Sequence, residues 1–321
     1  MRTCFNSLRK FWGVAAVAAA ITVMTACGGA GSNADGAAED GKKIRIVTTI
    51  AQIAEPLSVI GGDKVSVQSL MGPGVDPHLY NATQGDIGKL ENSDMIFYSG
   101  LHLEANMVRV FEEIGKKKPT LGIGETLPKD QLLKDEEGNT DPHIWFDIEL
   151  WKQGLAAATE KLKEHAGEHA DYFEANKMKY FAELDALKKE SVTKLGEIPK
   201  DKRVLITAHD AFGYFGRMLG LEVIGLQGLS TEDEVGLTDI EDTVKLLTNY
   251  KVPAVFVESS INPASIQAVI EGAKKKGLDV KQGGELFSDA MGAAGTPEGT
   301  YIGMYRHNVD TIYKALSGKG E

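Results

Sequence analysis

The chain has 321 residues, of which 42% are hydrophobic and 25% are charged. A chain of this length forms about two domains with real hydrophobic cores, and the composition excludes a disordered or fibrous protein. The formal net charge of −11 argues against nucleic acid or an anionic lipid surface as the binding partner.

The first residues predict an exported protein with a lipid anchor. Arg2, Arg9 and Lys10 precede an apolar run at 11–25, which is the order of a secretory signal peptide. The run is about 15 residues long, whereas a membrane-spanning helix needs roughly 20. "MTAC" at 24–27 resembles the lipobox of bacterial lipoproteins, which implies cleavage before Cys27 and lipidation of its thiol. The alternative is an ordinary exported protein in which this cysteine is incidental.

We therefore expect residues 1–26 to be a lipoprotein signal peptide and 27–43, rich in Gly, Ala, Ser and Asp, to be a flexible tether. Cleavage would remove Cys4 and three of the 35 basic residues. The mature chain would then carry 32 basic and 46 acidic side chains, a formal charge of −14. Cys27 would be its one cysteine, so no intrachain disulfide is expected.

The segments after the tether predict a strand, a helix and a second strand at 43–50, 51–62 and 64–70. The segment 203–226 repeats this pattern with an offset of 159, which pairs Thr48 with Thr207. The offset persists to the strand patterns "MIFYS" (95–99) and "AVFVE" (254–258). This repeat predicts an α/β fold of two similar lobes, each with a mostly parallel sheet flanked by helices.

A long helical pattern separates the two halves. Residues 171–196 contain no proline, are dense in Ala, Glu, Lys and Leu, and place apolar residues at helical spacing (Phe173, Tyr180, Leu184 and Leu187). At 1.5 Å per residue such a helix would be roughly 39 Å long, enough to bridge two lobes. We therefore expect an N-terminal lobe at 44–170, a rigid linking helix at 171–197 and a C-terminal lobe at 198–321. A surface helix packed on one lobe is the alternative.

The tripeptide Asp-Pro-His occurs twice, in "VDPHLY" (75–80) and "TDPHIWFD" (140–147), in a chain with seven histidines. Proline fixes its own φ and keeps the preceding residue extended, so His78 and His143 each leave a stiff turn. A stiff turn suits a metal ligand. Asp76 and Asp141 are placed to accept the second imidazole N–H and fix the tautomer.

Two further candidates follow strands in the second half. His209 follows the buried-strand pattern "VLIT", and Asp289 follows the apolar pair Leu286–Phe287. Ligands gather at the carboxyl ends of strands in open α/β sheets. Each residue alone is more often structural, but two candidates from each half predict a site in the cleft between the lobes.

Seven segments together resemble the metal-binding lipoproteins that feed ABC importers of manganese or zinc, the cluster A-I or zinc-uptake-type solute-binding proteins. These segments are "MGPGVDPHLY", "YSGLHLE", "DPHIWFD", "ITAHDAFGYF", "GLQGLSTEDEVGL", "VFVESS" and "FSDAMG". The match covers residues 44 to 318. It implies two lobes joined by one long rigid helix and a metal held by His78, His143, His209 and Asp289.

The resemblance also implies the setting of the protein. We expect a monomer held by Cys27 at the outer face of the bacterial cytoplasmic membrane, with the permease of a metal importer as partner. His102 and Glu104 lie in the motif "YSGLHLE" but are not usual ligands of the family, so we expect them to be structural or to support the ligands from behind. Glu258 ends the strand pattern "AVFVE", so it is a candidate to support the ligands from behind, together with Asp76 and Asp141. Mn²⁺ is the expected cargo and Zn²⁺ the alternative, because no histidine-rich loop of the zinc type is present and the overall match is to manganese-type members.

Two other classes of function stay open from the residues alone. A metal-dependent hydrolase usually keeps three protein ligands and an open position for water, so a His3Asp set favours carriage over catalysis. The sequence also lacks HExxH, a nucleophile elbow and a phosphate-binding glycine loop, so we expect no enzyme activity. An adhesin is the third reading, and it would have no use for buried histidines.

The other histidines predict no chemistry. His165 and His169 lie in a charged helical stretch and are expected in solvent. His307 lies in the last helix, whose start we place at Thr296, as a cap, and Pro297, in the first turn.

Overall fold

The computed structural model describes residues 43–318, which belong to the second of two compact units, Gly41–Glu321. The predictions for the signal peptide, Cys27 and the tether lie outside the described residues, apart from Lys43. Within the described part, no helix is both long and apolar enough to span a bilayer.

The N-terminal lobe is built on a four-stranded parallel sheet with the order β2-β1-β3-β4. Its strands are β1 (Ile44–Thr48), β2 (Val65–Ser69), β3 (Met95–Tyr98) and β4 (Thr120–Gly122). Its helices are α1 (Ala51–Gly61), α2 (Gln84–Asn92), α3 (Val108–Gly115) and α4 (Ile148–His165). The predicted strand, helix, strand unit at 43–70 is therefore confirmed.

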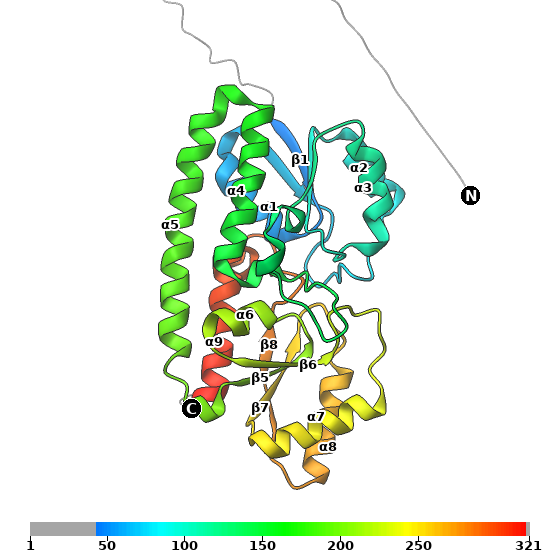
Figure 1. Ribbon diagram of the computed structural model, residues 1–321, viewed down its shortest axis with the longest axis vertical. Coiled ribbons are helices and arrows are strands. Elements are labelled where there is room, and N and C mark those ends of the chain that lie inside the picture. Colours follow the sequence, from blue (N-terminus) through cyan, green and yellow to red (C-terminus); the bar gives the residue numbers. More distant parts are fainter. Residues whose placement is uncertain (1–42, 319–321) are drawn as a thin grey trace, which may run out of the picture. The chain divides into compact units, whose positions relative to one another are not determined.

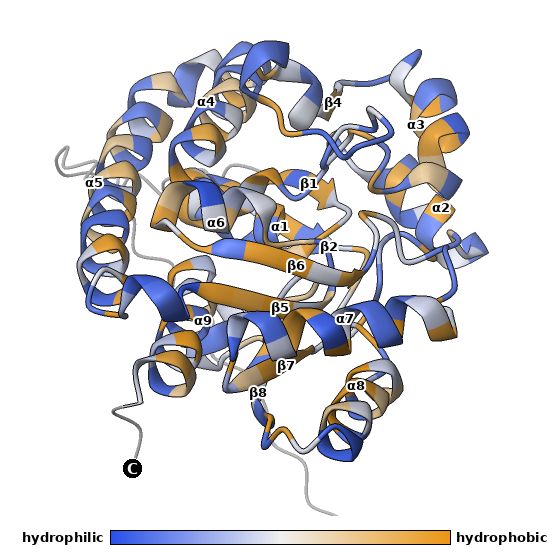
Figure 2. Cartoon of the chain, turned by 60° about the horizontal axis from the view of Figure 1, so that its bottom comes forward, coloured by the Kyte–Doolittle hydropathy of each residue, from blue (hydrophilic) through white to orange (hydrophobic). Residues whose placement is uncertain are grey.

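The C-terminal lobe repeats this arrangement in two parallel pairs. β5 (Val204–His209) pairs with β6 (Glu222–Gln227), and β7 (Ala254–Glu258) pairs with β8 (Lys281–Leu286). Figure 2 shows β6, β5, β7 and β8 side by side, and β5 packs against β7. This order matches β2-β1-β3-β4 at the predicted offset, so the prediction of two similar α/β lobes is confirmed. The helices are α6 (Gly213–Leu219), α7 (Leu237–Tyr250), α8 (Ala264–Lys275) and α9 (Tyr301–Ser317).

Strand β8 is one of the elements that the sequence pattern did not predict. Its sequence KQGGEL contains two glycines and one buried apolar residue, Leu286, so it has neither strand alternation nor a β-branched run. Backbone pairing with the fully buried strand β7 forms it instead.

Helix α5 (Ala170–Leu195) joins the two lobes (Figure 1). Its 26 residues pack on α1 and α4 of the first lobe and on α6 and α9 of the second. The predicted stripe of Phe173, Tyr180, Leu184 and Leu187 is buried. The alternative of a helix packed on one lobe is therefore wrong. The domain boundaries 44–170, 171–197 and 198–321 stay a prediction.

Buried aromatic residues fill the region where the lobes meet. The Trp145–Phe146 segment of the first lobe packs against Phe212, and Phe146 also contacts Phe215 and Tyr305. Because these rings are removed from water, their packing stabilises the position of the segment that follows His143.

The start of the last helix differs from the prediction. Thr296 caps a short 3₁₀ turn at Pro297–Gly299, as its side chain accepts from the Gly299 N–H, whereas α9 begins at Tyr301. The N-cap of α9 is Thr300, which accepts from the Gly303 N–H at 3.0 Å. Thr296 and Thr300 each begin a Thr-x-x-Gly cap, and the continuous helix follows the second of these caps.

Candidate metal centre

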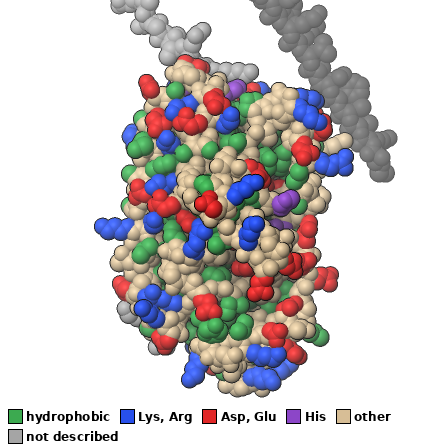
Figure 3. Space-filling model, viewed as in Figure 1, with side chains coloured by type: hydrophobic (Ala, Val, Ile, Leu, Met, Phe, Trp, Pro, Cys, Tyr) green, Lys and Arg blue, Asp and Glu red, His purple; other side chains and the backbone are tan. Residues whose placement is uncertain are grey.

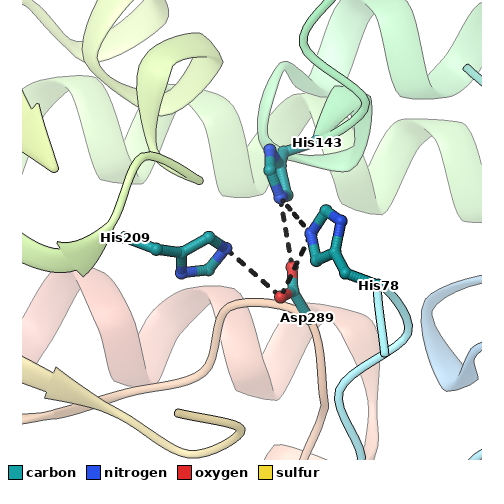
Figure 4. Close-up of side chains that lie close together, drawn as sticks. All are labelled: His78, His143, His209 and Asp289. Atoms are coloured by element: carbon teal, nitrogen blue, oxygen red, sulfur yellow. Dashed lines mark hydrogen bonds and ion pairs between the residues drawn. The ribbon is translucent and has the colours of Figure 1, made fainter. Parts of the chain in front are cut away.

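Four side chains far apart in the sequence converge in one buried cluster (Figure 4). His78 lies between β2 and α2, and His143 lies just before α4. His209 is the last residue of β5, and Asp289 follows β8. All four are at most 3% exposed, and one ligand atom from each lies within 4.8 Å of the others. The structure thus brings together the four residues predicted as ligands, two from each lobe.

The distances within the cluster are short. His78 Nε2 lies 3.4 Å from His143 Nε2 and 3.7 Å from Asp289 Oδ2. Asp289 Oδ1 lies 3.3 Å from His143 Nε2, and Oδ2 lies 3.2 Å from His209 Nε2. Ligands at about 2.1 Å around a tetrahedral metal are about 3.4 Å from one another. The four side chains are therefore spaced as ligands of one divalent ion.

The carboxylate of Asp289 adds a second argument for a cation. Both oxygens are fully buried, and neither meets a donor in hydrogen-bond geometry among residues 43–318. A buried carboxylate without hydrogen bonds is costly unless a positive charge compensates it. The residues present therefore fit a bound divalent cation.

Asp141 holds the ring of His143. Asp141 Oδ1 accepts from the His143 backbone N–H at 2.9 Å and lies 2.8 Å from the ring Nδ1. The Nδ1–H then donates to the carboxylate, and Nε2 is left free to face the cluster. The structure places Asp141 where the sequence predicted it.

Asp76 occupies the same place in the other Asp-Pro-His copy but does not hold the ring. Its Oδ1 accepts from the His78 backbone N–H at 2.9 Å, and its Oδ2 accepts from Thr231 Oγ1 at 2.6 Å. The expectation that Asp76 fixes the His78 tautomer is therefore wrong. The reason is the hydroxyl of the opposite lobe, which turns the carboxylate away from the imidazole.

Glu258 lies behind His209. Its Oε2 is 2.6 Å from His209 Nδ1, and its Oε1 accepts from the His209 backbone N–H at 2.9 Å. Because Glu258 ends β7 and His209 ends β5, which packs against it, the two residues meet at the carboxyl ends of these strands. The sequence pointed to Glu258 by the same strand-end argument.

Two of the predicted supporting residues are elsewhere. Glu104 is buried but accepts from the Thr49 hydroxyl and from the backbone N–H groups of Ser99 and Gly100, which closes the ends of β1 and β3. His102 is exposed and has a φ of 68°. Among the described residues, no hydrogen bond or ion pair joins either of them to the four clustered side chains, which favours the structural alternative. Both belong to a motif that shapes the loop backbone.

The sequence reasoning missed two residues that cross between the lobes at the cluster. Thr231 reaches Asp76, and Gln52 Nε2 donates to the Ser288 carbonyl at 3.1 Å, next to Asp289. Nothing in their local pattern marks them, because a hydroxyl in an acidic loop and an amide in a first helical turn are ordinary.

Burial and charge divide the imidazoles into two kinds. Burial lowers the pKa of His78 to about 3, against a smaller opposing effect of Asp289. Burial also disfavours the charged form of His143, but the carboxylates of Asp141 and Asp289 outweigh it and raise its pKa to about 9. Burial also opposes the charged form of His209, but Glu258 and Asp289 outweigh it and raise the pKa of His209. The pKa of Asp289 falls below its usual range because the attraction of His209 and His143 exceeds the cost of burial. Without metal, the neighbouring carboxylates therefore favour the protonated forms of His143 and His209.

The remaining histidines lie away from the cluster. His165 is exposed, and His169 packs its ring edge on Phe173 at the start of α5. His307 is partly exposed, with its Nε2 2.9 Å from the Glu285 carbonyl. The expected solvent position holds for His165, whereas His169 is half-buried.

Comparison with known proteins decides the family. The model of the zinc-uptake complex component A, periplasmic, matches residues 46–315. The chain belongs to this family. Its members are the metal-binding solute-binding proteins of ABC importers, so the chain is a solute-binding protein and not an enzyme, and the hydrolase and adhesin alternatives do not fit.

Individual members of the zinc-uptake family match over most of their length. The manganese-binding lipoprotein MntA of Bacillus subtilis is 48% identical over 94% of this chain and 98% of its own. The manganese ABC transporter substrate-binding lipoprotein PsaA of Streptococcus mitis is 30% identical over 92% of this chain and 96% of its own. The solved structure of the periplasmic zinc-binding protein TroA of Treponema pallidum superposes with a TM-score of 0.84. TroA is 44% identical to this chain, and the match covers 86% of this chain and all of the TroA chain.

Proposed function

We propose that this chain captures a divalent transition metal outside the cell, with His78, His143, His209 and Asp289 as its ligands, and delivers it to the permease of an ABC importer. The observation that carries the proposal is the buried His3Asp cluster shared by the two lobes. Each lobe supplies two ligands, so binding closes the site from both sides and release requires the lobes to separate. A carrier needs such a reversible enclosure, whereas a catalytic site keeps a position open.

We propose Mn²⁺ as the cargo and Zn²⁺ as the alternative. The relatives at 48% and 30% identity are named for manganese, whereas TroA is named for zinc. The ligand set lies between the two preferences, because imidazole suits zinc and a carboxylate suits manganese. Asp289 turns one oxygen to His143 and the other to His209, so both are available to a metal that takes more than four ligands.

We further propose a monomer anchored through a lipid on Cys27 at the outer face of the cytoplasmic membrane. The support is the lipobox-like "MTAC" and the relatives named as lipoproteins. On the face in Figure 3, charged side chains of both signs lie between the hydrophobic ones, which suits a protein in contact with water.

Elemental analysis of protein purified from its native host, without chelators, tests the proposal. We expect about one equivalent of manganese or zinc per chain. Asp289→Ala should retain far less, whereas Asp135→Ala, in an exposed loop, should retain the wild-type amount. A wild-type protein that neither contains metal nor takes up Mn²⁺ or Zn²⁺ after dialysis would overturn the proposal.

A further inference from the structure

The two ligand turns of the first lobe are held in very different ways. The turn of His143 is fixed by three buried tyrosines of the second half of the chain. The Tyr214 hydroxyl donates to the Asp141 carbonyl at 2.9 Å, and those of Tyr301 and Tyr305 donate to the carbonyls of Trp145 and Phe146. Because these hydrogen bonds lie in an aromatic core, this turn cannot separate from the second lobe without exposing that core.

The turn of His78 is far more open. Residues 72–74 are exposed, and Leu79, next to the ligand, is 51% exposed. Within residues 43–318 and apart from the metal cluster itself, one hydrogen bond reaches this turn from the second lobe, from Thr231 Oγ1 to Asp76 Oδ2 at 2.6 Å. The other oxygen of Asp76 accepts from the His78 backbone N–H at 2.9 Å. A single carboxylate thus connects the opposite lobe to the ligand backbone.

Thr231 is itself held in place by the second lobe. Gln227 ends β6, and its side-chain amide donates to the carbonyls of Thr231, at 2.9 Å, and Asp233. Gln227 is also the residue that pairs with the ligand His209 in the β5–β6 register. A short path therefore runs from His209 through Gln227, Thr231 and Asp76 to His78, across the cleft.

We propose that Thr231 is a positioning residue that latches the His78 turn to the second lobe and slows release of the bound metal. The inference rests on the proposed metal site. When the lobes separate at this side, the Thr231–Asp76 hydrogen bond must break together with the bond from His78 to the metal. A hydrogen bond to a carboxylate is stronger than one between neutral groups, so its loss should shorten the residence time of the ion.

The test is the rate of Mn²⁺ release into excess EDTA, followed by the fluorescence of Trp145, whose ring centroid lies 5.4 Å from that of His143. Thr231→Val keeps the shape and removes the hydroxyl, and we expect release about tenfold faster. Thr231→Ser should restore the wild-type rate. Thr193→Val, on the exposed face of α5, is the matched control and should release at the wild-type rate. The metal-free form of each of the four proteins should still unfold in one cooperative transition, so that a faster release cannot be attributed to loss of the fold.

A double-mutant cycle with Asp76→Ala separates the latch from a general effect of the loop. In the Asp76→Ala background, Thr231→Val should have no further effect on release. The latch is wrong if Thr231→Val releases Mn²⁺ at the wild-type rate, or if Thr231→Ser releases it as fast as Thr231→Val does. It is also wrong if Thr231→Val accelerates release by the same factor in the Asp76→Ala background as in the wild type. These outcomes differ from a failure of the proposed function, in which the wild-type protein would bind neither Mn²⁺ nor Zn²⁺.

Discussion

His78 Nε2 and His143 Nε2 lie 3.4 Å apart inside the protein, although the two residues are 65 positions apart. At this separation the two nitrogens either share a proton or bind one metal. With the Asp289 oxygens at 3.3 and 3.7 Å, the second arrangement uses every ligand atom in the cluster. Metal binding at this pair should therefore increase the stability of the folded protein.

The first prediction concerns thermal stability. A ligand that binds the native state alone adds RT ln(1 + [L]/Kd), roughly 4 kcal/mol at a thousandfold excess over Kd. The melting temperature of the wild type should rise with added Mn²⁺ or Zn²⁺, and His143→Ala should lose most of that rise. His165→Ala, which changes an exposed histidine, should keep it. Equal behaviour of the two variants in differential scanning fluorimetry would remove His143 from the ligand set.

The second prediction is that metal-free protein is most stable near neutral pH. The pKa of His143 is raised to about 9, so its contribution is fully present below its ordinary value near 6.5 and is lost as pH rises through about 9. The pKa of His78 is lowered to about 3, so the stability that its neutral form supplies falls as pH decreases from about 6.5 towards 3. Urea unfolding in EDTA, repeated between about pH 3 and about pH 9, measures the loss of stability on the acid side and on the alkaline side. His143→Ala should flatten the alkaline limb, and an unchanged limb would contradict the assignment.

The second prediction extends to metal affinity, which should change with pH in the opposite sense to stability on the alkaline side. Metal ligation requires neutral rings, so Mn²⁺ must displace the protons held by His143 and His209. The apparent affinity should therefore increase from about pH 6.5 to 8.5, with proton release on binding. Calorimetry in buffers of different ionisation enthalpy counts those protons. Binding without proton release would show that both rings are already neutral.

The third prediction separates what the site prefers from what it carries. A nitrogen-rich site binds zinc more tightly than manganese, so Zn²⁺ should outcompete Mn²⁺ in purified protein even if manganese is the physiological cargo. His209→Glu should narrow this gap because it replaces a nitrogen with an oxygen. Since Glu258 lies 2.6 Å from His209 Nδ1, the variant is best combined with Glu258→Gln to avoid two adjacent carboxylates. An unchanged ratio in competition titrations at one pH would show that cleft geometry sets the selectivity.

The fourth prediction tests the support behind the ligand ring. Asp141→Asn should weaken metal affinity about 10- to 100-fold, because the amide cannot hold the imidazole Nδ1–H as a carboxylate does. Asp135→Asn, in the exposed loop that precedes the motif, should leave the affinity unchanged. Titration against a chelator of known affinity gives both values. An affinity loss below twofold for Asp141→Asn would show that packing alone orients His143.

The fifth prediction concerns the anchor. Cys27→Ser should shift the protein from the membrane to the external soluble fraction, because no thiol would remain for lipidation. Metal binding should be retained, since the ligands lie far along the chain. Fractionation of cells, with metal content measured on the soluble form, checks both points. A substituted protein that still partitions wholly into the membrane would contradict the lipobox interpretation.

Much of the fold and the ligand set can be predicted from the sequence because these features are local. Apolar periodicity marks the strands and α5, and the offset between the β-branched runs reveals the repeated lobe. Proline before His78 and His143 marks two stiff turns, and strand ends mark His209 and Glu258. Each signal depends on neighbours within a few residues, so it does not require knowledge of the folded chain.

The tertiary structure alone decides how these local units are used. Strand β8 forms through backbone pairing with β7, although its own sequence gives no strand signal. The two Asp-Pro-His copies share one sequence, but the carboxylate of Asp141 holds its own imidazole while that of Asp76 turns to Thr231, 155 positions away. The local pattern sets the backbone of each turn. The carboxylate of Asp76 follows the hydroxyl that the opposite lobe presents, and that donor comes into contact only when the chain is folded.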